Sequence, residues 1–247
     1  MRLPRIKGLI KRRILVNYRV DPTAITRLLP DPLRPKLHEG YAIAGICLIR
    51  LENIRPAGIP GFLGIKSENA AHRVAVEWPD STGQWREGVF IPRRDTSSFL
   101  NAAAGGRVFP GEHHRAHFQV RDDGKEIDFA MDSEDGQTRV RLRGRDAEAL
   151  PGSSCFGCLA DSSRFFENGS LGYSATSDPN RMDGIRLQVE TWQVRALQID
   201  AVESSYFDDP ATFPQGSAVF DHALVMRDIP HEWIGEADLQ TVEKAVT

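Results

Sequence analysis

Residues 126–144, EIDFAMDSEDGQTRVRLRG, decide the fold class of this chain. Two alternating segments, 126–132 and 138–144, flank a short polar turn with an Asp-Gly pair, and this arrangement is typical of a β-hairpin. Alternation places the apolar side chains on one face: Ile127, Phe129, Met131, Val140 and Leu142. The opposite face carries the charged side chains Asp128, Asp132, Arg139, Arg141 and Arg143. The sequence therefore predicts two antiparallel strands with one buried face.

The rest of the chain continues this pattern of short elements. Seven further segments are short and rich in Val, Ile and Phe, and we expect them to be strands: 41–49, 70–78, 87–93, 113–120, 185–191, 193–203 and 217–226. We expect four helices, at 22–29, 95–104, 155–167 and 236–246. In the first of them, Asp21 suits the N-cap and Pro22 the first helical position. The pattern predicts a β-dominated α+β fold with a barrel or strongly bent sheet as its core.

Composition excludes several classes of protein. The chain of 247 residues is 40% hydrophobic and 26% charged with a net charge of −3, as in ordinary globular proteins. We find no internal repeat or linker, and expect a single domain over residues 1–247. No stretch approaches the roughly 18–20 apolar residues that span a bilayer, and the near-neutral charge gives no reason to bind nucleic acid. Three cysteines and the lack of a signal-peptide core predict a cytoplasmic location.

One predicted strand carries ionisable residues on an apolar face. In residues 68–78, the face that holds Ala70, Val74, Val76 and Trp78 begins with Glu68 and His72. Buried ionisable groups need partners, and clusters of them at the mouth of a cavity are candidate site residues. The alternative is a strand end at which both side chains are solvated.

Residues 111–117 hold three of the seven histidines. On a strand, His114 points inward with the apolar side chains, whereas His113 and His117 lie on the polar face, so the three cannot ligate one metal ion. Cys155 and Cys158 form a CxxC motif without the second pair that a structural zinc site needs, and a packing role is favoured. The common nucleotide, hydrolase and metalloprotease signatures are absent, and we expect neither a metal nor a cofactor.

Two adjacent stretches, 17–22 (NYRVDP) and 28–35 (LLPDPLRP), resemble the acetoacetate decarboxylase-like superfamily, and its uncharacterised, domain-of-unknown-function branch more than the decarboxylases. The resemblance continues more weakly through residues 40–41, 67–69, 88–92 (GVFIP), 104–110 (AGGRVFP) and 225–233 (VMRDIPHEW). It implies a closed, cone-like β-barrel flanked by helices, usually in homo-oligomers, with the site inside the cone.

The resemblance also implies roles for single residues. Arg19 matches an arginine that lines the decarboxylase pocket, Glu68 matches a pocket glutamate, and Glu87 is a looser candidate for another. In the decarboxylases a lysine forms a Schiff base with a β-keto acid, and a second lysine lowers its pKa. This chain has Gly111 and Glu112 where that lysine pair should stand. Schiff-base decarboxylation is therefore not expected here.

Three hypotheses remain open from the sequence. In the first, the protein is an enzyme for a small carboxylate or carbonyl compound, in which Arg19 binds the anionic group and Glu68, with His72 or His114, transfers protons. In the second, the same cavity belongs to a non-catalytic small-molecule binder or sensor. In the third, the protein is structural, and Arg19 and Glu68 form a buried ion pair without a void beside them.

The missing lysine pair leads to a chemical prediction. Borohydride reduces an imine to a stable amine, so it traps a Schiff-base intermediate on the lysine that formed it. Because only six lysines exist and none stands at the expected position, borohydride with acetoacetate should leave the mass of the protein unchanged. An acetoacetate-dependent adduct on any lysine, located by mass spectrometry, would contradict this prediction.

Overall fold

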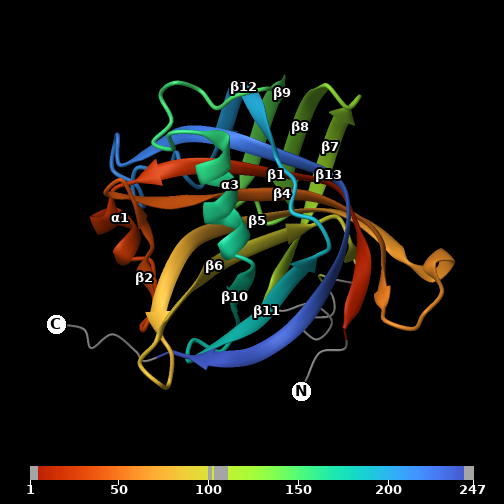
Figure 1. Ribbon diagram of the computed structural model, residues 1–247, viewed down its shortest axis with the longest axis horizontal. Coiled ribbons are helices and arrows are strands. Elements are labelled where there is room, and N and C mark those ends of the chain that lie inside the picture. The colour runs from red at the N-terminus through yellow and green to blue at the C-terminus, as the bar shows by residue number, and fades with distance from the viewer. Residues whose placement is uncertain (1–4, 100–101, 103–110, 242–247) are drawn as a thin grey trace.

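The computed structural model describes residues 5–99, 102 and 111–241 (Figure 1). The first half of the chain contains β1 (Ile6–Val20), α1 (Pro22–Thr26), β2 (Arg34–Pro35), β3 (Leu37–His38), β4 (Tyr41–Pro56), the 3₁₀ turn η1 (Gly61–Leu63), β5 (Ile65–Pro79) and β6 (Trp85–Thr96). The second half contains β7 (His113–Asp122), β8 (Glu126–Ser133), β9 (Arg139–Ala147), α3 (Leu159–Asn168), β10 (Leu171–Ala175), β11 (Arg181–Val189), β12 (Arg195–Ser204) and β13 (Ala218–Gln240).

Nine of the described strands form a closed ring of hydrogen-bonded neighbours. The order is β6, β7, β8, β9, β12, β13, β1, β4 and β5, and β5 pairs again with β6. Neighbours in the ring are antiparallel except for β6 and β7, which are parallel. Outside the ring, β10 pairs with β6, and β11 pairs with both β10 and the second half of β13. The expected β-dominated fold with a mixed sheet is confirmed.

Strands β1, β4 and β5 are buried on both faces. One face points into the ring, where a first apolar core contains Ile14, Val16, Ile46 and Phe129. The other face points outward to a second core, which α3 covers with Phe166 (Figure 1). A strand with two buried faces loses the alternation of apolar and polar residues, which explains the nearly continuous apolar run of β4.

The hairpin of residues 126–144 forms as predicted. The five side chains expected inside, from Ile127 to Leu142, are at most 3% exposed. On the outer face, Arg141 forms an ion pair with Asp132 at 2.8 Å. The alternation of apolar and charged residues was enough to predict the buried face of this hairpin, because the other face of β8 and β9 meets solvent.

The helices agree with expectation only in part. Helix α1 begins after Asp21, whose side chain accepts a hydrogen bond from the Thr23 amide at 2.7 Å, as predicted. Helix α3 begins at Leu159, four residues later than expected. The Ser154 hydroxyl donates to Asp221 at 2.6 Å and accepts from the Phe156 amide at 3.1 Å, but the N-cap of the helix is Cys158.

Two helix predictions need correction. Residues 236–240 belong to β13, where they pair with β11, and residues 242–247 lie outside the described residues. Asp95 lies in strand β6 and does not cap a helix. Phe99 and Ala102 are helical as expected, and residues 100–101 and 103–104 of the expected helix lie outside the described residues. Strands β1 and β10 were not expected.

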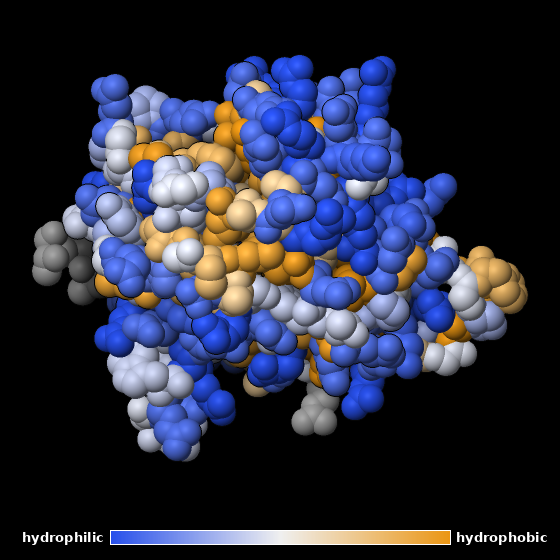
Figure 2. Space-filling model, turned by 45° about the horizontal axis from the view of Figure 1, so that its top comes forward, coloured by the Kyte–Doolittle hydropathy of each residue, from blue (hydrophilic) through white to orange (hydrophobic). Residues whose placement is uncertain are grey.

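The surface has one strongly apolar projection. At the tip of the β4–β5 hairpin, Phe62 is 85% exposed and Leu63 60% exposed, and Figure 2 shows this tip as an apolar patch at the edge of the molecule. Among the described helices, none has the length and apolar character needed to cross a bilayer.

Close contact between β1 and β4 leads to a prediction about stability. A Cβ atom on Gly45 would collide with the carbonyl oxygen of Val16 on the neighbouring strand. Gly45→Ala should therefore reduce the free energy of unfolding by about 1–3 kcal/mol, as overpacking does. Gly152→Ala, where the added Cβ meets open space, is the control and should change stability by less than ~0.5 kcal/mol. Equal urea midpoints for the two variants would contradict the close packing.

Candidate functional site

Arg19 lies on the outer face of β1 and is held by groups around the segment before α3. Its guanidinium donates to the Ser153 carbonyl at 2.7 Å and forms an ion pair with Asp221 at 3.2 Å. The side chain is 27% exposed. Arg19 was expected to bind the anionic group of a ligand, but the Asp221 carboxylate of the protein already neutralises it.

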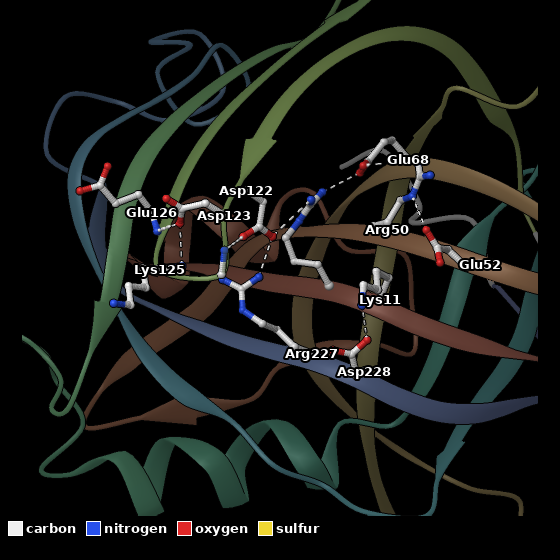
Figure 3. Close-up of polar contacts among 12 residues, drawn as sticks. Lys11, Arg50, Glu52, Glu68, Asp122, Asp123, Lys125, Glu126, Arg227 and Asp228 are labelled. Carbon is white, nitrogen blue, oxygen red and sulfur yellow. Dashed lines mark hydrogen bonds and ion pairs between the residues drawn. The ribbon is translucent and has the colours of Figure 1, made fainter.

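Glu68 lies at one end of the strand ring in a cluster of ion pairs (Figure 3). Arg12 contacts its carboxylate at 2.6 Å and Arg50 at 3.7 Å. Burial raises the pKa of Glu68, and the two arginines oppose that shift. Asp122 joins Arg12 to Arg227, at 3.7 Å and 2.6 Å. These charges neutralise one another, as in a structural network.

His72 is fully buried inside the ring, as its place on the apolar face predicted. Its ring lies 4.5 Å from that of Tyr206, and its two nitrogens have no hydrogen-bond partner among the described residues. Burial, with a smaller contribution from Arg93, lowers the pKa of His72 to about 3. The imidazole is therefore neutral and serves as part of the apolar core.

The other expected residues lie at the surface. His114 lies beside Asp135 at 3.3 Å with its side chain 37% exposed, so the expectation that it points inward is wrong. Glu87 forms an ion pair with Lys36.

The structure does not bring Arg19 and Glu68 together. Strand pairing aligns Glu68 with Arg50 and Arg50 with Arg12, seven residues before Arg19 on β1. At about 3.3 Å per residue, this places Arg19 and Glu68 ~23 Å apart along the sheet. Glu68 faces the ring interior and Arg19 the outer core, so they lie on opposite faces as well.

A cavity of about 110 Å³ lies on the outer face of the sheet, between the strands and the C-terminal end of α3. Its apolar wall includes Ile91, Phe166, Ile185, Trp192 and Trp233. Two small residues, Ala71 and Gly172, also line it, and their short side chains help to keep the space open.

Three arginines from three strands line this cavity: Arg13 of β1, Arg73 of β5 and Arg94 of β6. Arg13 donates to the sulfur of Cys47 at 3.2 Å, and Arg94 donates to the Ser174 hydroxyl at 2.9 Å. Arg73 donates to the Asn17 side-chain oxygen. In the part of the chain that the structure describes, none of the three has a carboxylate within ion-pair distance.

Burial makes these cations costly. It lowers the pKa of Arg73 and of Arg94 to about 10 each, so both remain charged at neutral pH. Asp95 also lines the cavity, but Arg93 binds its carboxylate at 2.8 Å and Thr138 donates to it at 3.3 Å. A desolvated cation without a counter-ion is unfavourable, and the cavity is therefore prepared for an anion.

His113 is the histidine that reaches the cavity. Burial, reinforced by Arg94, lowers the pKa of His113 to about 3, so the ring is neutral. Its Nδ1 lies 3.1 Å from the Gly111 carbonyl, to which a neutral ring donates from this nitrogen. The sequence placed His113 on the polar face of a strand, and the cavity wall covers that face.

A buried polar network supports Arg73 from behind. Asn17 Nδ2 lies 3.1 Å from His222 Nε2, Ser162 Oγ lies 2.7 Å from the same nitrogen, and His222 Nδ1 lies 2.6 Å from Asp221. Asp221 and His222 are adjacent in sequence yet meet because β1 and β13 slip register here, and such a bulge re-aims side chains.

The order Ser–His–Asp is that of a hydrolytic triad. However, all three side chains are at most 2% exposed and none lines the cavity. The network holds α3 and Asn17, and therefore Arg73, in place.

The sequence interpretation missed Arg13, Arg73, Arg94 and Cys47. A signal existed on β5, where Arg73 shares a face with Ala71 and Ala75. Two alanines beside an arginine are consistent with a second buried face, but alternation within β5 alone does not reveal what covers it. In the described residues, no group of three or more His, Cys, Asp or Glu side chains could hold a metal ion.

Solved structures share this fold over nearly the whole chain. The acetoacetate decarboxylase of Legionella pneumophila is 12% identical with a TM-score of 0.58, over 96% of this chain and 88% of that one. An acetoacetate decarboxylase-like enzyme from Sphingomonas wittichii RW1 is also 12% identical with a TM-score of 0.58, over 96% and 93%. The enduracididine biosynthesis enzyme MppR, complexed with pyruvate, is 14% identical with a TM-score of 0.57, over 96% and 89%. The chain thus has the fold of acetoacetate decarboxylase-like proteins.

The chain belongs to the family DUF2071, described as an uncharacterized conserved protein, whose model matches residues 10–223. No curated protein matches the chain. The resemblance inferred from the sequence, to an uncharacterised branch of the superfamily, is confirmed.

Replacing an arginine that has a carboxylate partner and one that lacks such a partner should have different effects on the free energy of unfolding. Arg94→Met removes a desolvated cation that lacks a carboxylate, so the free energy of unfolding should stay unchanged or rise by about 1 kcal/mol. Arg12→Met breaks the ion pair with Glu68 and should cost about 3–5 kcal/mol. Urea denaturation of both variants measures the difference. A loss of more than 2 kcal/mol in Arg94→Met would mean that Arg94 is a structural residue.

Proposed function

We propose that this protein binds a small organic carboxylate in the cavity between the outer face of the sheet and α3. The observation that carries the proposal is the set of three arginines, Arg13, Arg73 and Arg94, which share one cavity and have no carboxylate partner in the described part of the chain. A guanidinium recognises a carboxylate through two parallel hydrogen bonds, which makes this group the natural counter-ion.

The walls of the cavity favour an organic anion with an apolar body. Phe166, Trp192 and Trp233 face a space in which an inorganic ion would leave apolar surface uncovered. Small-molecule sites commonly combine such walls with a few polar anchors. The volume of about 110 Å³ limits the ligand to a compact molecule.

The structures of similar fold are consistent with this proposal. MppR is complexed with pyruvate, a small carboxylate, although at 14% identity the likeness supports the fold alone. In the described residues no lysine lines the cavity, so imine formation is not part of the proposal. Both an enzyme and a sensor would need the binding step.

We further propose, as the sequence predicts, that the protein is a single domain with a cytoplasmic location. We also propose that it forms homo-oligomers, as the family resemblance implies.

Matched acids and amides test the proposal. Phenylacetate and phenylacetamide have nearly the same shape and differ in charge, as do hexanoate and hexanamide. We expect the acids to raise the melting temperature and the amides to have no effect, since a ligand at a hundred times its Kd stabilises by about 2.7 kcal/mol. Calorimetric titration then gives the Kd of the acid with the largest effect.

Variants assign the effect to the cavity. Arg94→Met and Arg13→Met should weaken acid binding about tenfold or more, because a hydrogen bond to a charged group contributes about 1.5–3 kcal/mol. Arg86→Met, at an exposed arginine paired with Asp80, is the control and should bind like the wild type. Equal stabilisation by acids and amides, no stabilisation by either acid, or unchanged affinity in both cavity variants would overturn the proposal.

A further inference from the structure

Cys47 lies at the centre of the three arginines. It is on β4, directly between Leu15 of β1 and Ala71 of β5, and Ala71 in turn lies opposite Arg94 of β6. Because Ala71 is short, no bulky side chain of β5 stands between the sulfur and the Arg94 guanidinium. The thiol lines the cavity and is 8% exposed.

One of the three arginines contacts this sulfur directly. Arg13 Nε donates to Cys47 Sγ at 3.2 Å. Arg73 and Arg94 line the same cavity as the sulfur, and a negative charge on Cys47 would oppose the effect of burial, which lowers the pKa of both arginines. A thiolate is the reactive form of cysteine, and electropositive surroundings are typical of reactive cysteines.

A second observation points to a ligand at the same place. Arg73 is 4% exposed and lines the cavity, and its Nε has no hydrogen-bond partner in the described part of the chain. An anionic group bound by Arg73 and its two neighbours would lie beside the sulfur. Such positioning accelerates a reaction because it replaces a chance encounter by a held geometry.

We propose that Cys47 is the nucleophile of this cavity and adds reversibly to the carbonyl carbon of a small aldehyde or oxo acid whose carboxylate is held by the arginines. The inference rests on the proposed function, since the carboxylate site directs the reaction. In the addition, a bond forms between sulfur and the carbonyl carbon while the π bond of the carbonyl breaks. The thiol proton passes to the carbonyl oxygen, and no redox partner or leaving group is needed.

The other two cysteines have different surroundings and serve as internal controls. Cys155 is half-buried, and burial together with Asp221 raises the pKa of its thiol to about 12. Cys158 is exposed and lies 3.3 Å from the Asp161 carboxylate. Arg19 lies near Cys155 but is neutralised by Asp221, so anionic reagents have no uncompensated cation to guide them to either cysteine, as they have at Cys47.

Alkylation with iodoacetate and iodoacetamide tests whether the arginines attract anionic reagents to Cys47. Each reagent forms a sulfur–carbon bond as iodide leaves, and the two differ in charge but hardly in size. We expect the ratio of the iodoacetate rate to the iodoacetamide rate at Cys47, followed by peptide mass spectrometry, to exceed that of the urea-unfolded chain about tenfold or more. Cys158 should show no such increase, and Arg94→Met should reduce the ratio at Cys47.

Glyoxylate and glycolate test the covalent step. Both are small carboxylates, but glyoxylate has an aldehyde where glycolate has an alcohol. Glyoxylate should protect Cys47 from alkylation at a concentration at least about tenfold lower than glycolate, and dilution should restore the reactivity, because the addition is reversible. Equal protection by the two acids, or an unchanged rate ratio at Cys47, would overturn the inference.

Cys47→Ser separates this inference from the proposed function. The variant lacks the nucleophile but keeps the three arginines, so glyoxylate should lose its advantage over glycolate when the two acids are compared by thermal shift. If acids bind and Cys47 shows no directed alkylation, the inference about Cys47 fails and the binding proposal stands. If acids do not bind the wild type, the binding proposal fails and the covalent proposal with it.

Discussion

Burial of strands β1, β4 and β5 on both faces is the constraint on which the rest of the structure depends. The ring of strands encloses one core, and α3 with β10 and β11 covers a second core against the outside of the same three strands. Every side chain of these strands must therefore find an apolar or a paired environment. On the outer face Arg73 is buried and Arg13 is half-buried, and the position of these arginines defines the candidate site.

The arginines of β1 show how the two faces differ. Arg12 points into the end of the ring, where Glu68 and Asp122 neutralise it. Arg13, the next residue, points to the outer face and meets a thiol and an indole ring, with Arg13 placed 5.7 Å from the centre of Trp192. Adjacent residues with the same charge thus have opposite environments because strand geometry turns them to different cores. Arg12 is paired with carboxylates, whereas Arg13 has no carboxylate partner among the described residues.

The sequence was informative where one face of a strand meets water. For the hairpin of β8 and β9, the sequence predicted correctly which residues face the core. Apolar residues such as Phe129 alternate with charged ones such as Arg141, and the two kinds lie on opposite faces. Strand β1 was missed because Lys7, Lys11, Arg12 and Arg13 interrupt its apolar residues. In the structure Lys7 and Lys11 reach solvent and Arg12 is paired with Glu68. The helix expected at 236–246 was wrong because pairing with β11, a tertiary contact, decided the conformation.

The sequence and the structure select different residues for the candidate site. A small carboxylate bound by arginine was inferred, but Arg19 was selected through a family resemblance, and in the structure Asp221 already neutralises it. His72 was selected for the correct reason, its place on an apolar face, and the same burial makes it neutral and without polar contacts. Which buried charges lack partners depends on the pairing of strands that are distant in sequence, and no local pattern reports it.

The bulge at Asp221 connects the site to the rest of the fold. It turns Asp221 and His222 to one side of β13, where Asp221 binds Ser154 and the Cys155 amide, and His222 meets Ser162 of α3 and Asn17 of β1. The same network therefore fixes the helix that covers the cavity and the amide that orients Arg73. Because Asn17 offers Arg73 a neutral oxygen and not a carboxylate, the guanidinium is held in position while its charge stays uncompensated. A carboxylate at residue 17 would satisfy Arg73 from within and remove the reason for it to bind an external anion.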